Sequence, residues 1–447
     1  MSDTIAAIAT ANGVGSIAIV RISGEKARSV ALTMSRKTAL TPRYAALVSL
    51  YDHHNELIDE AILLYFEGPK SFTGEDVVEF QCHGGFIVAQ RVLRAVLEQG
   101  VRLAEPGEFS KRAFLNGRLD LTQAEAIASL IEAKSDDAAR ILARQMKGEL
   151  REYVEKIRDA LLEILAYSEV VIDYAEEDLP QDVVDQILRK LEAITRDLSK
   201  TLESSRRRSG LMQGYRVAII GKPNVGKSSL LNALLDYERA IVSDIAGTTR
   251  DTIEEQVRIG THLIRLVDTA GIRAAHDEIE RIGIERSIVA IEGADVVIAL
   301  FDASRSIDEE DQAILALIER YKEQKPFITV LNKSDLPTQF ETDALEMYAP
   351  IRLSCKQETR ELIDALTALM DHDNDSEEMM LISERQISAT SDALRSIQES
   401  YEPLKSEELE IFSFHINQAI RAMASLTRPY ELDEMFDKMF GQFCLGK

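Results

Sequence analysis

A complete phosphate-binding loop, Gly221–Ser228 with the sequence GKPNVGKS, constrains the fold of this chain more than any other segment. The preceding run Arg216–Ile220 is mostly apolar and β-branched, which predicts a buried strand, and Ser229–Leu235 has the composition of a helix. A loop of this kind between a strand and a helix predicts a P-loop domain that binds a nucleoside triphosphate with Mg²⁺.

Each residue type in the loop suits a polyphosphate. Gly221 and Gly226 allow backbone N–H groups to curl around the phosphates at the start of the following helix, where negative charge is favoured. Lys227 is predicted to act on the β- and γ-phosphate oxygens during catalysis, and the Ser228 hydroxyl is predicted to ligate Mg²⁺. The nucleotide-binding residues predicted in this segment are Asn224, Val225, Gly226, Lys227, Ser228 and Ser229.

A second motif, Asn332–Asp335 with the sequence NKSD, follows the apolar run Phe327–Leu331 and selects the base. The Asp335 carboxylate can accept hydrogen bonds from N1–H and the N2 amine of guanine, which adenine does not offer in that arrangement. Because a site with an unpaired buried polar group rejects the wrong base, the predicted nucleotide is GTP. Ser354–Lys356 is expected to place a backbone N–H near guanine O6. The residues predicted here are Asn332, Lys333, Ser334, Asp335, Ser354, Cys355 and Lys356.

Two further segments have the character of nucleotide-sensing switches. The strand-like run Leu263–Val267 leads into Asp268–Gly271, a DxxG motif that supplies an aspartate near Mg²⁺ and a backbone N–H at the γ-phosphate. In the loop at 243–251, one threonine should close on Mg²⁺, and Thr249 is preferred. The GTP-binding residues predicted in these segments are Ser243, Asp244, Ile245, Ala246, Gly247, Thr248, Thr249, Asp268, Thr269, Ala270 and Gly271.

Two features separate this domain from a Ras-like switch. Ras-like proteins position the attacking water with a glutamine directly after DxxG, but Ile272 stands there, so a residue in the stretch His276–Glu280 must hold the water. Asn224 lies inside the P-loop, beside the Ser243–Thr249 loop. Together they favour a potassium ion that neutralises charge developing between the β- and γ-phosphates over a plain turn asparagine.

The remaining composition bounds the class of protein. A chain of 447 residues is long enough for about three domains. It contains no transmembrane run, and its N-terminus lacks the basic region of a signal peptide. Three scattered cysteines are too few for a disulfide framework, so the protein is predicted to be cytoplasmic. A net charge of −24 argues against a general nucleic-acid binder, so any contact with RNA needs a local basic patch or a second protein.

The pattern along the chain predicts a multidomain α/β and α protein. Residues 1–120 are predicted as an α/β domain, 121–210 as the first part of a helical domain, 211–371 as the GTPase domain, and 372–447 as the second part of the helical domain. Helical segments on both sides of a compact α/β domain indicate that a Ras-like GTPase domain is inserted into the helical domain.

Three local patterns in the terminal regions receive structural interpretations. Gly13–Ala18 resembles a dinucleotide fingerprint, but a β-branched strand follows its glycines where a helix is required. Cys82–His83 could indicate nucleophilic catalysis, but no orienting carboxylate is evident, so a structural role is preferred. Cys444 lies four residues from the end, where Gly446 and Lys447 break a prenylation pattern, so it is a free thiol that could be catalytic or could dock in a site.

Across essentially its full length the chain resembles the tRNA-modification GTPases of the MnmE (TrmE) family. It departs from the usual family pattern at Ala424–Pro429 and at Ser383–Gln386. The resemblance rests on the inserted GTPase domain and on Ile17–Gly24, Phe72–Val77, Pro106–Ser110, Arg112–Gly117 and the terminal Phe-Cys-x-Gly-Lys at 443–447.

The resemblance implies a homodimer formed through the N-terminal domain, which binds 5-formyl- or 5,10-methylene-tetrahydrofolate as the one-carbon source. It places the folate contacts on Arg21, Glu79, Arg118 and Lys447, with Cys444 held near the folate. Physically, the basic residues suit an anionic cofactor and a carboxylate can accept from pterin N–H groups.

The resemblance also implies that the GTPase domains pair across the dimer in the presence of K⁺ and GTP. The K⁺ ligands would be Asn224, Ser243, the Ile245 carbonyl and Thr248, and the carboxylate that orients the attacking water would be Glu280. This last assignment fills the gap left by Ile272.

The implied activity is addition of an aminomethyl or carboxymethylaminomethyl group to C5 of the wobble uridine, position 34, of certain tRNAs. An FAD protein of the MnmG (GidA) family would be the obligate partner in a heterotetramer and could hold most of the tRNA. Two alternatives remain. One is a ribosome-assembly or signalling GTPase that modifies no base, and the other is a GTP-driven dimerisation scaffold.

Overall fold

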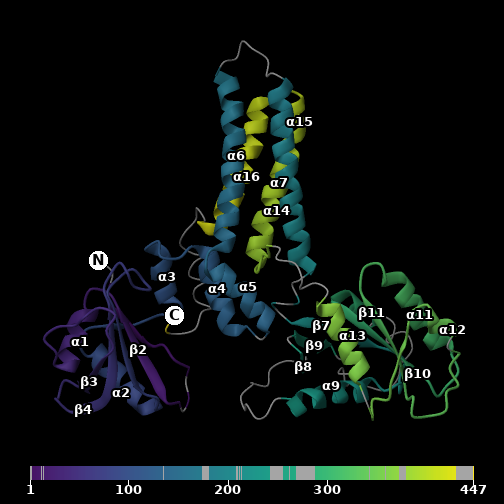
Figure 1. The fold of residues 1–447 in the computed structure, drawn as a ribbon, viewed down its shortest axis with the longest axis horizontal. Coiled ribbons are helices and arrows are strands. Elements are labelled where there is room, and N and C mark those ends of the chain that lie inside the picture. Colours follow the sequence, from purple (N-terminus) through teal and green to yellow (C-terminus); the bar gives the residue numbers. More distant parts are fainter. Residues whose placement is uncertain are drawn as a thin grey trace. The chain divides into compact units, whose positions relative to one another are not determined.

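The computed structural model describes residues 3–11, 13, 15–133, 135–173, 181–207, 210, 212, 214–241, 255–260, 262–267, 287–341, 343–357, 359–371, 379–428 and 446. The chain divides into two compact units. The first comprises Met1–Ser129, Arg144–Lys190 and Arg395–Lys447, and the second comprises Leu130–Ala143 and Leu191–Leu394. Figure 1 shows the elements of both units.

The first unit contains a six-stranded sheet in the order β3-β4-β5-β2-β1-β6. Its strands pair antiparallel, apart from the parallel pair of β1 and β6 at one end. The strand bounds are β1 Ile5–Ile8, β2 Ile17–Ser23, β3 Ala46–Tyr51, β4 Leu57–Phe66, β5 Val77–His83 and β6 Arg102–Leu103. The strand β2 follows the glycines of the dinucleotide-like segment, which confirms that the segment is not a nucleotide fingerprint.

Alternation along β2 separates the two faces of this sheet. Ala18, Val20 and Ile22 are buried in one core with residues of α1 (Ala27–Ser35) and α2 (Phe86–Leu97). On β1, Ile5 and Ala7 pack instead with Phe109 of α3 (Glu108–Leu115). The predicted strands at 5–9, 16–22 and 77–80 and the predicted helix at 84–99 are confirmed, whereas β3, β4 and α1 were not predicted.

Helices flank the P-loop region on both sides in the sequence. Before it come α4 (Leu121–Glu132), α5 (Asp136–Met146), α6 (Glu149–Asp173) and α7 (Gln181–Arg207), and after it come α14 (Glu384–Glu399), α15 (Tyr401–Lys405) and α16 (Leu409–Thr427). Within the first unit α6 and α16 pack along each other, where the hydroxyls of Ser168 and Ser413 lie 3.0 Å apart (Figure 1). The predicted break at 179–180 and the linker from 372 to 378 lie outside the described residues.

The second unit contains a second six-stranded sheet, in the order β12-β11-β10-β7-β9-β8. All neighbours are parallel except β8 and β9. The strands are β7 Tyr215–Ile220, β8 Glu255–Ile259, β9 His262–Val267, β10 Val296–Asp302, β11 Phe327–Asn332 and β12 Ile351–Arg352. The predicted strands at 216–220, 263–267 and 327–331 are confirmed.

Helices cover both faces of this parallel sheet, as such sheets require. On one face, residues of α9 (Lys227–Ile241) and α13 (Arg360–Asp371) pack on the sheet. On the other, residues of α11 (Glu309–Tyr321) and α12 (Asp343–Glu346) do so. The loops that follow β7, β10 and β11 therefore meet at one edge, which is where such folds bind ligands. Among the described residues, every helix is too short or too polar to cross a bilayer.

Candidate functional site

The P-loop connects β7 to α9 with the backbone conformation that its residue types predict. Gly221 and Gly226 have φ values of 153° and 109°, and Asn224 has a φ of 63°. A Cβ on Gly221 would lie 2.5 Å from the Leu300 carbonyl oxygen of β10, and a Cβ on Gly226 would collide with the Asn332 side-chain amide. Only glycine at both positions lets the loop lie this close to the neighbouring strands, so the loop fits the role of a phosphate cradle.

Lys227 lies inside this loop, at the first residue of α9. Its Nζ donates hydrogen bonds to the carbonyls of Gly221 and Lys222, each at 2.8 Å. The backbone carbonyls of the loop therefore hold the Lys227 ammonium in place, at the start of a helix where phosphates are favoured. Ser228 and Ser229 are exposed in the same turn, which suits a magnesium ligand and a phosphate contact.

Asn332 joins the three predicted nucleotide-binding segments. Its side chain is buried at the end of β11, where Nδ2 donates to the Val225 carbonyl at 2.8 Å and Oδ1 accepts from the Cys355 N–H at 3.1 Å. One amide thus ties the P-loop, the NKSD motif and the SCK loop together. The structure brings these segments to one place, as the sequence predicts.

Lys333 makes a second link between the NKSD motif and the P-loop. Its Nζ donates to the Asn224 carbonyl at 2.9 Å and to Asp302 Oδ2 at 2.6 Å, and its backbone is left-handed with a φ of 64°. Burial alone would raise the pKa of Asp302, but hydrogen bonds from Lys333 and Ser304 outweigh it and hold the pKa below its ordinary value. Asp302 is a site residue that the sequence analysis missed, because nothing in its local pattern marks it.

The base-reading groups beside this link are accessible. Asp335 is exposed, and the loop that carries it is tied down by a hydrogen bond from the Ser334 N–H to the Leu353 carbonyl at 3.2 Å. In the SCK loop, the Lys356 N–H points toward Ser354 Oγ at 3.4 Å. Burial, with a smaller contribution from Asp335, raises the pKa of Cys355 to about 11, so this thiol is neutral near pH 7.

A buried ion cluster beside the P-loop was also missed. The Lys222 Nζ lies 2.6 Å from Asp308 Oδ2 and 2.6 Å from Asp311 Oδ2, at the N-terminus of α11. Both the Lys222 and the Asp311 side chains are buried. The lysine is separated from its partners by more than eighty positions in sequence, so no local signal could have found the cluster.

In the N-terminal sheet, Arg21 and Glu79 are cross-strand partners on β2 and β5. Arg21 Nε donates to Glu79 Oε1 at 2.9 Å, and the guanidinium carbon lies 5.7 Å from the ring centroids of both Phe72 and Phe109. Both side chains are partly exposed, at 21% and 14%. The pair therefore presents a cation and a carboxylate side by side, as the folate prediction requires.

Arg118 contacts the loop that carries Phe72. Its Nε donates to the Ser71 carbonyl at 3.0 Å. The same loop is anchored by buried Arg112, whose Nη1 lies 3.1 Å from Glu75 and whose Nη2 lies 3.0 Å from Glu108. Arg112 thus holds this loop in place, whereas the sequence analysis named it only as part of a family motif.

Gly446 of the C-terminal tail lies against β1. Its carbonyl accepts a hydrogen bond from Arg21 Nη1 at 3.3 Å. With a φ of 95°, a Cβ there would lie 2.5 Å from the Ile8 carbonyl oxygen. The tail therefore reaches the Arg21–Glu79 pair, and only glycine allows so close an approach.

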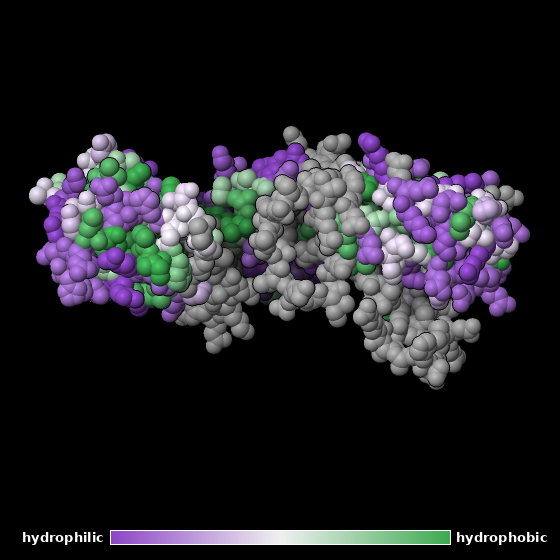
Figure 2. Space-filling view, turned by 90° about the horizontal axis from the view of Figure 1, so that it is seen from below, coloured by the Kyte–Doolittle hydropathy of each residue, from purple (hydrophilic) through white to green (hydrophobic). Residues whose placement is uncertain are grey.

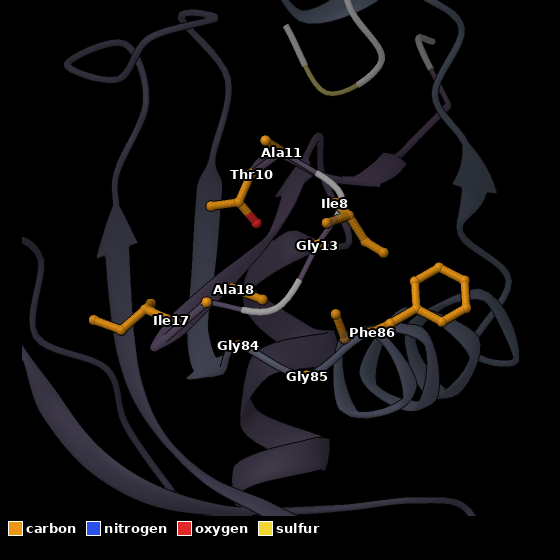
Figure 3. A pocket seen from close by; sticks show the side chains of 11 residues that line it. Ile8, Thr10, Ala11, Gly13, Ile17, Ala18, Gly84, Gly85 and Phe86 are labelled. Carbon is orange, nitrogen blue, oxygen red and sulfur yellow. The ribbon is translucent and has the colours of Figure 1, made fainter. Parts of the chain in front are cut away.

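A cavity of about 310 Å³ opens in the same domain between the end of β1 and the start of α2 (Figure 3). Neither Arg21, Glu79 nor Arg118 lines it. It is lined by Ile8, Thr10, Ala11, Gly13, Gly15, Ile17, Ala18, Gly84, Gly85, Phe86 and Ala89.

One statement of the sequence analysis is wrong. An orienting carboxylate does exist for His83, because Asp59 Oδ1 lies 2.8 Å from His83 Nδ1. A catalytic pair of Cys82 and His83 is nevertheless excluded. Cys82 points to the opposite, buried face of β5, and its Sγ donates to the Ala18 carbonyl at 3.3 Å. Burial, with a smaller contribution from Asp59, raises the pKa of Cys82 to about 11. The structural role predicted for Cys82 is the one that fits.

The remaining predicted site residues lie outside the described part of the chain, and their roles stay predictions. They are Ser243, Asp244, Ile245, Ala246, Gly247, Thr248, Thr249, Asp268, Thr269, Ala270, Gly271, Glu280, Cys444 and Lys447.

Comparison with known proteins finds matches along essentially the whole chain. Residues 4–118 match the profile of the GTP-binding protein TrmE N-terminus, and residues 121–444 match that of the MnmE helical domain. The tRNA modification GTPase MnmE of Sulfurimonas denitrificans is 65% identical over 445 residues, covering 100% of this chain and 99% of the relative. Those of Nitratiruptor sp. and Sulfurovum sp. are 61% and 58% identical, with the same coverage.

Proposed function

The chain belongs to the MnmE family of tRNA modification GTPases, and from this premise we propose its full reaction. It hydrolyses GTP in a potassium-activated manner and, with a flavin-dependent partner of the MnmG (GidA) family, modifies C5 of the wobble uridine, position 34, of certain tRNAs. The group installed is aminomethyl or carboxymethylaminomethyl, and a tetrahydrofolate supplies its one-carbon unit.

The observation that carries the nucleotide half of this proposal is the position of Asn332. Its amide contacts the P-loop at Val225 and the SCK loop at Cys355, so phosphate binding and guanine reading share one rigid support. A site organised in this way binds GTP in preference to ATP when Asp335 accepts from the guanine edge.

Magnesium and potassium would supply positive charge to the phosphates as negative charge develops on them. Ser228 and Thr249 would hold Mg²⁺, and Asn224, Ser243, the Ile245 carbonyl and Thr248 would hold K⁺. Of these residues the structure describes Ser228 and Asn224, both exposed in the P-loop. Glu280 would orient the attacking water, in place of the glutamine that Ile272 replaces.

The Arg21–Glu79 pair supports the folate half. Arg21, Arg118 and Lys447 would bind the anionic cofactor, and Glu79 would accept from pterin N–H groups. The contact of Gly446 with Arg21 and with Ile8 brings the C-terminal tail to this pair. Cys444, two residues earlier on that tail, would then lie near the one-carbon unit.

Exposed apolar side chains support a homodimer formed through the N-terminal domain. Leu47 and Ile62 are cross-strand partners on β3 and β4, with exposed fractions of 69% and 38%, and Ile17 on β2 is 57% exposed. Figure 2 shows hydrophobic surface gathered on this domain on the face in view. Because patches of this kind mark protein contacts, we assign them to a second copy of the chain.

The acidic composition supports a division of labour with the partner. A net charge of −24 disfavours the binding of a polyanion by this chain alone. We therefore assign most of the tRNA contact to the MnmG-family protein within a heterotetramer, and we assign the complex to the cytoplasm.

The cation role is tested by GTP turnover in KCl and NaCl at equal ionic strength. We expect turnover to be faster in KCl by roughly tenfold or more, because a bound cation stabilises the charge that develops on the phosphates. Asn224→Ala should remove the difference between the salts while GDP binding persists. Equal rates for the wild type in both salts would contradict the potassium assignment.

A further inference from the structure

The ion cluster of Lys222, Asp308 and Asp311, in which Lys222 and Asp311 are buried, lies beside the phosphate-binding loop, but the proposed chemistry gives it no role. Lys222 is the second residue of the P-loop, and its side chain is only 5% exposed. We propose that Lys222 is a positioning residue of the GTPase site, which fixes the loop carbonyls that hold Lys227 and thereby sets where Lys227 meets the phosphates.

The two carboxylates that receive Lys222 are themselves fixed. Asp308 is the N-cap of α11, and its Oδ1 accepts from the Asp311 N–H at 3.1 Å. In return Asp311 Oδ2 accepts from the Asp308 N–H at 3.3 Å, which completes a capping box. The ammonium therefore binds to the end of a helix that the sheet holds in place, and not to a mobile surface group.

The Lys222 backbone, in turn, contacts Lys227, the residue predicted to act on the phosphates. The Lys222 side chain is anchored on α11, and its own carbonyl accepts a hydrogen bond from Lys227 Nζ at 2.8 Å. The adjacent Gly221 carbonyl accepts from the same ammonium, and Gly221 lies against Leu300 of β10. The backbone of residues 221 and 222 is thus held by α11 and β10 together, and Lys227 rests on it.

Charge decides against Lys222 as a phosphate ligand. Two carboxylates contact its ammonium at 2.6 Å, so the cluster as a whole is not positive. Burial would lower the pKa of Lys222, but the two hydrogen-bonded carboxylates outweigh burial and raise it, so the lysine stays charged and paired. Stability alone is a weak reason for such a cluster, since buried ion pairs often stabilise no more than apolar residues of similar volume.

The test separates positioning from folding with matched variants of the full-length chain. Lys222→Met alone would leave two acidic groups without their cation, so it is combined with Asp308→Asn and Asp311→Asn, which remove that charge. Asparagine is a good N-cap and its carbonyl oxygen can accept as aspartate does, so the capping box can persist. Lys322→Met at the other end of α11, where the lysine pairs with exposed Glu319, is the control.

Steady-state GTP hydrolysis and thermal unfolding are measured for each variant. We expect the triple variant to unfold near the wild-type temperature but to show a KM for GTP raised by roughly tenfold to a hundredfold, because a displaced Lys227 meets the phosphates poorly. The control should keep both constants. Wild-type kcat and KM in a folded triple variant would overturn the proposal.

A milder variant keeps the proposal testable if the triple variant does not fold. Asp308→Asn changes a half-exposed side chain and leaves Asp311 paired with Lys222. Because the ion pair becomes a hydrogen bond from the ammonium to an uncharged amide oxygen, we expect KM for GTP to rise by about threefold. An unchanged KM in this folded variant would overturn the positioning role.

Discussion

At the scale of single residues, one buried amide links the P-loop, the NKSD motif and the SCK loop. Asn332 donates to the P-loop and accepts from the SCK loop. Asp335, three residues later, is exposed and carries the predicted contacts with guanine. The two residues of one motif therefore have separable tasks, one of support and one of selection.

We predict that Asn332→Ala weakens GTP and XTP binding alike, by roughly tenfold to a hundredfold. The reason is that the Val225 carbonyl and the Cys355 N–H each lose a hydrogen-bond partner, at a cost of about 1 kcal/mol apiece. Equilibrium binding of fluorescent nucleotide analogues measures both affinities.

Asp335→Asn is the matched comparison for this variant. It should weaken GTP and relax the choice of base, because asparagine cannot accept from both guanine donors. A loss of base selectivity in Asn332→Ala, or unaltered selectivity in Asp335→Asn, would contradict this separation of tasks.

The backbone conformation of the P-loop could be predicted from the sequence, because its glycines leave a local signature. Glycines at 221 and 226 and the NKSD motif each mark a turn with fixed chemistry. Asp302 and Asp308 carry no such mark, since an aspartate after a strand or before a helix is common for other reasons. Their partners lie in other elements, so only the folded chain reveals them.

At the scale of elements, the ends of β10 and β11 are joined by an ion pair. Asp302 and Asn332 are register partners at those ends, and Lys333, the next residue, pairs with Asp302 at 2.6 Å. Asp302 is 2% exposed, so its charge is compensated by Lys333 and by the backbone and hydroxyl of Ser304.

This pair predicts a pH dependence of stability. The pKa of Asp302 is lowered from its ordinary 3.8, so the pair contributes stability that is present above about that pH and is lost as the pH falls through the lowered value. Asp302→Asn should therefore destabilise the protein by about 2 kcal/mol near neutral pH.

The difference between wild type and Asp302→Asn should shrink in acid. Thermal unfolding midpoints near pH 7 and near pH 3 test this, because only the wild type loses a native ion pair on acidification. An equal difference at both pH values would show that Asp302 stabilises the fold without its charge.

Three strands of each sheet were predicted, and the sequence patterns of the two sheets differ for a physical reason. The strands β7, β10 and β11 are buried on both faces and read as continuous apolar runs. On β4, by contrast, Ala61, Leu63 and Tyr65 face the core while Ile62 and Leu64 lie on the other face, so apolar residues on both faces hide the period of two.

At the scale of the whole molecule, Gly446 near the C-terminus contacts the N-terminal sheet. Gly446 and Arg21 are separated by 425 positions, yet Arg21 donates to the Gly446 carbonyl. No propensity or periodicity predicts such a contact, and only resemblance to the MnmE family pointed to it.

We predict that Gly446→Ala displaces the tail and weakens folate binding by roughly tenfold. Its added Cβ would meet the Ile8 carbonyl at 2.5 Å, and its φ of 95° disfavours any residue with a side chain. Titration with 5-formyl-tetrahydrofolate measures the loss, with Gly117→Ala as a control because a Cβ there meets nothing.

An unchanged folate affinity in Gly446→Ala would separate the tail from the cofactor site. Loss of affinity in Gly117→Ala to the same degree would instead point to strain in the N-terminal domain, since residue 117 has a positive φ as well. The nucleotide site provides an internal standard, and GTP turnover should stay unchanged in both variants.

The most direct test of the account is nucleoside analysis by mass spectrometry of tRNA from cells that lack this protein. Complementation with the wild-type chain and with Lys227→Ala completes the design. We predict that aminomethyl-type groups at C5 of wobble uridines disappear in the deletion, return with the wild type and do not return with the variant. An unchanged nucleoside profile in the deletion would contradict the account.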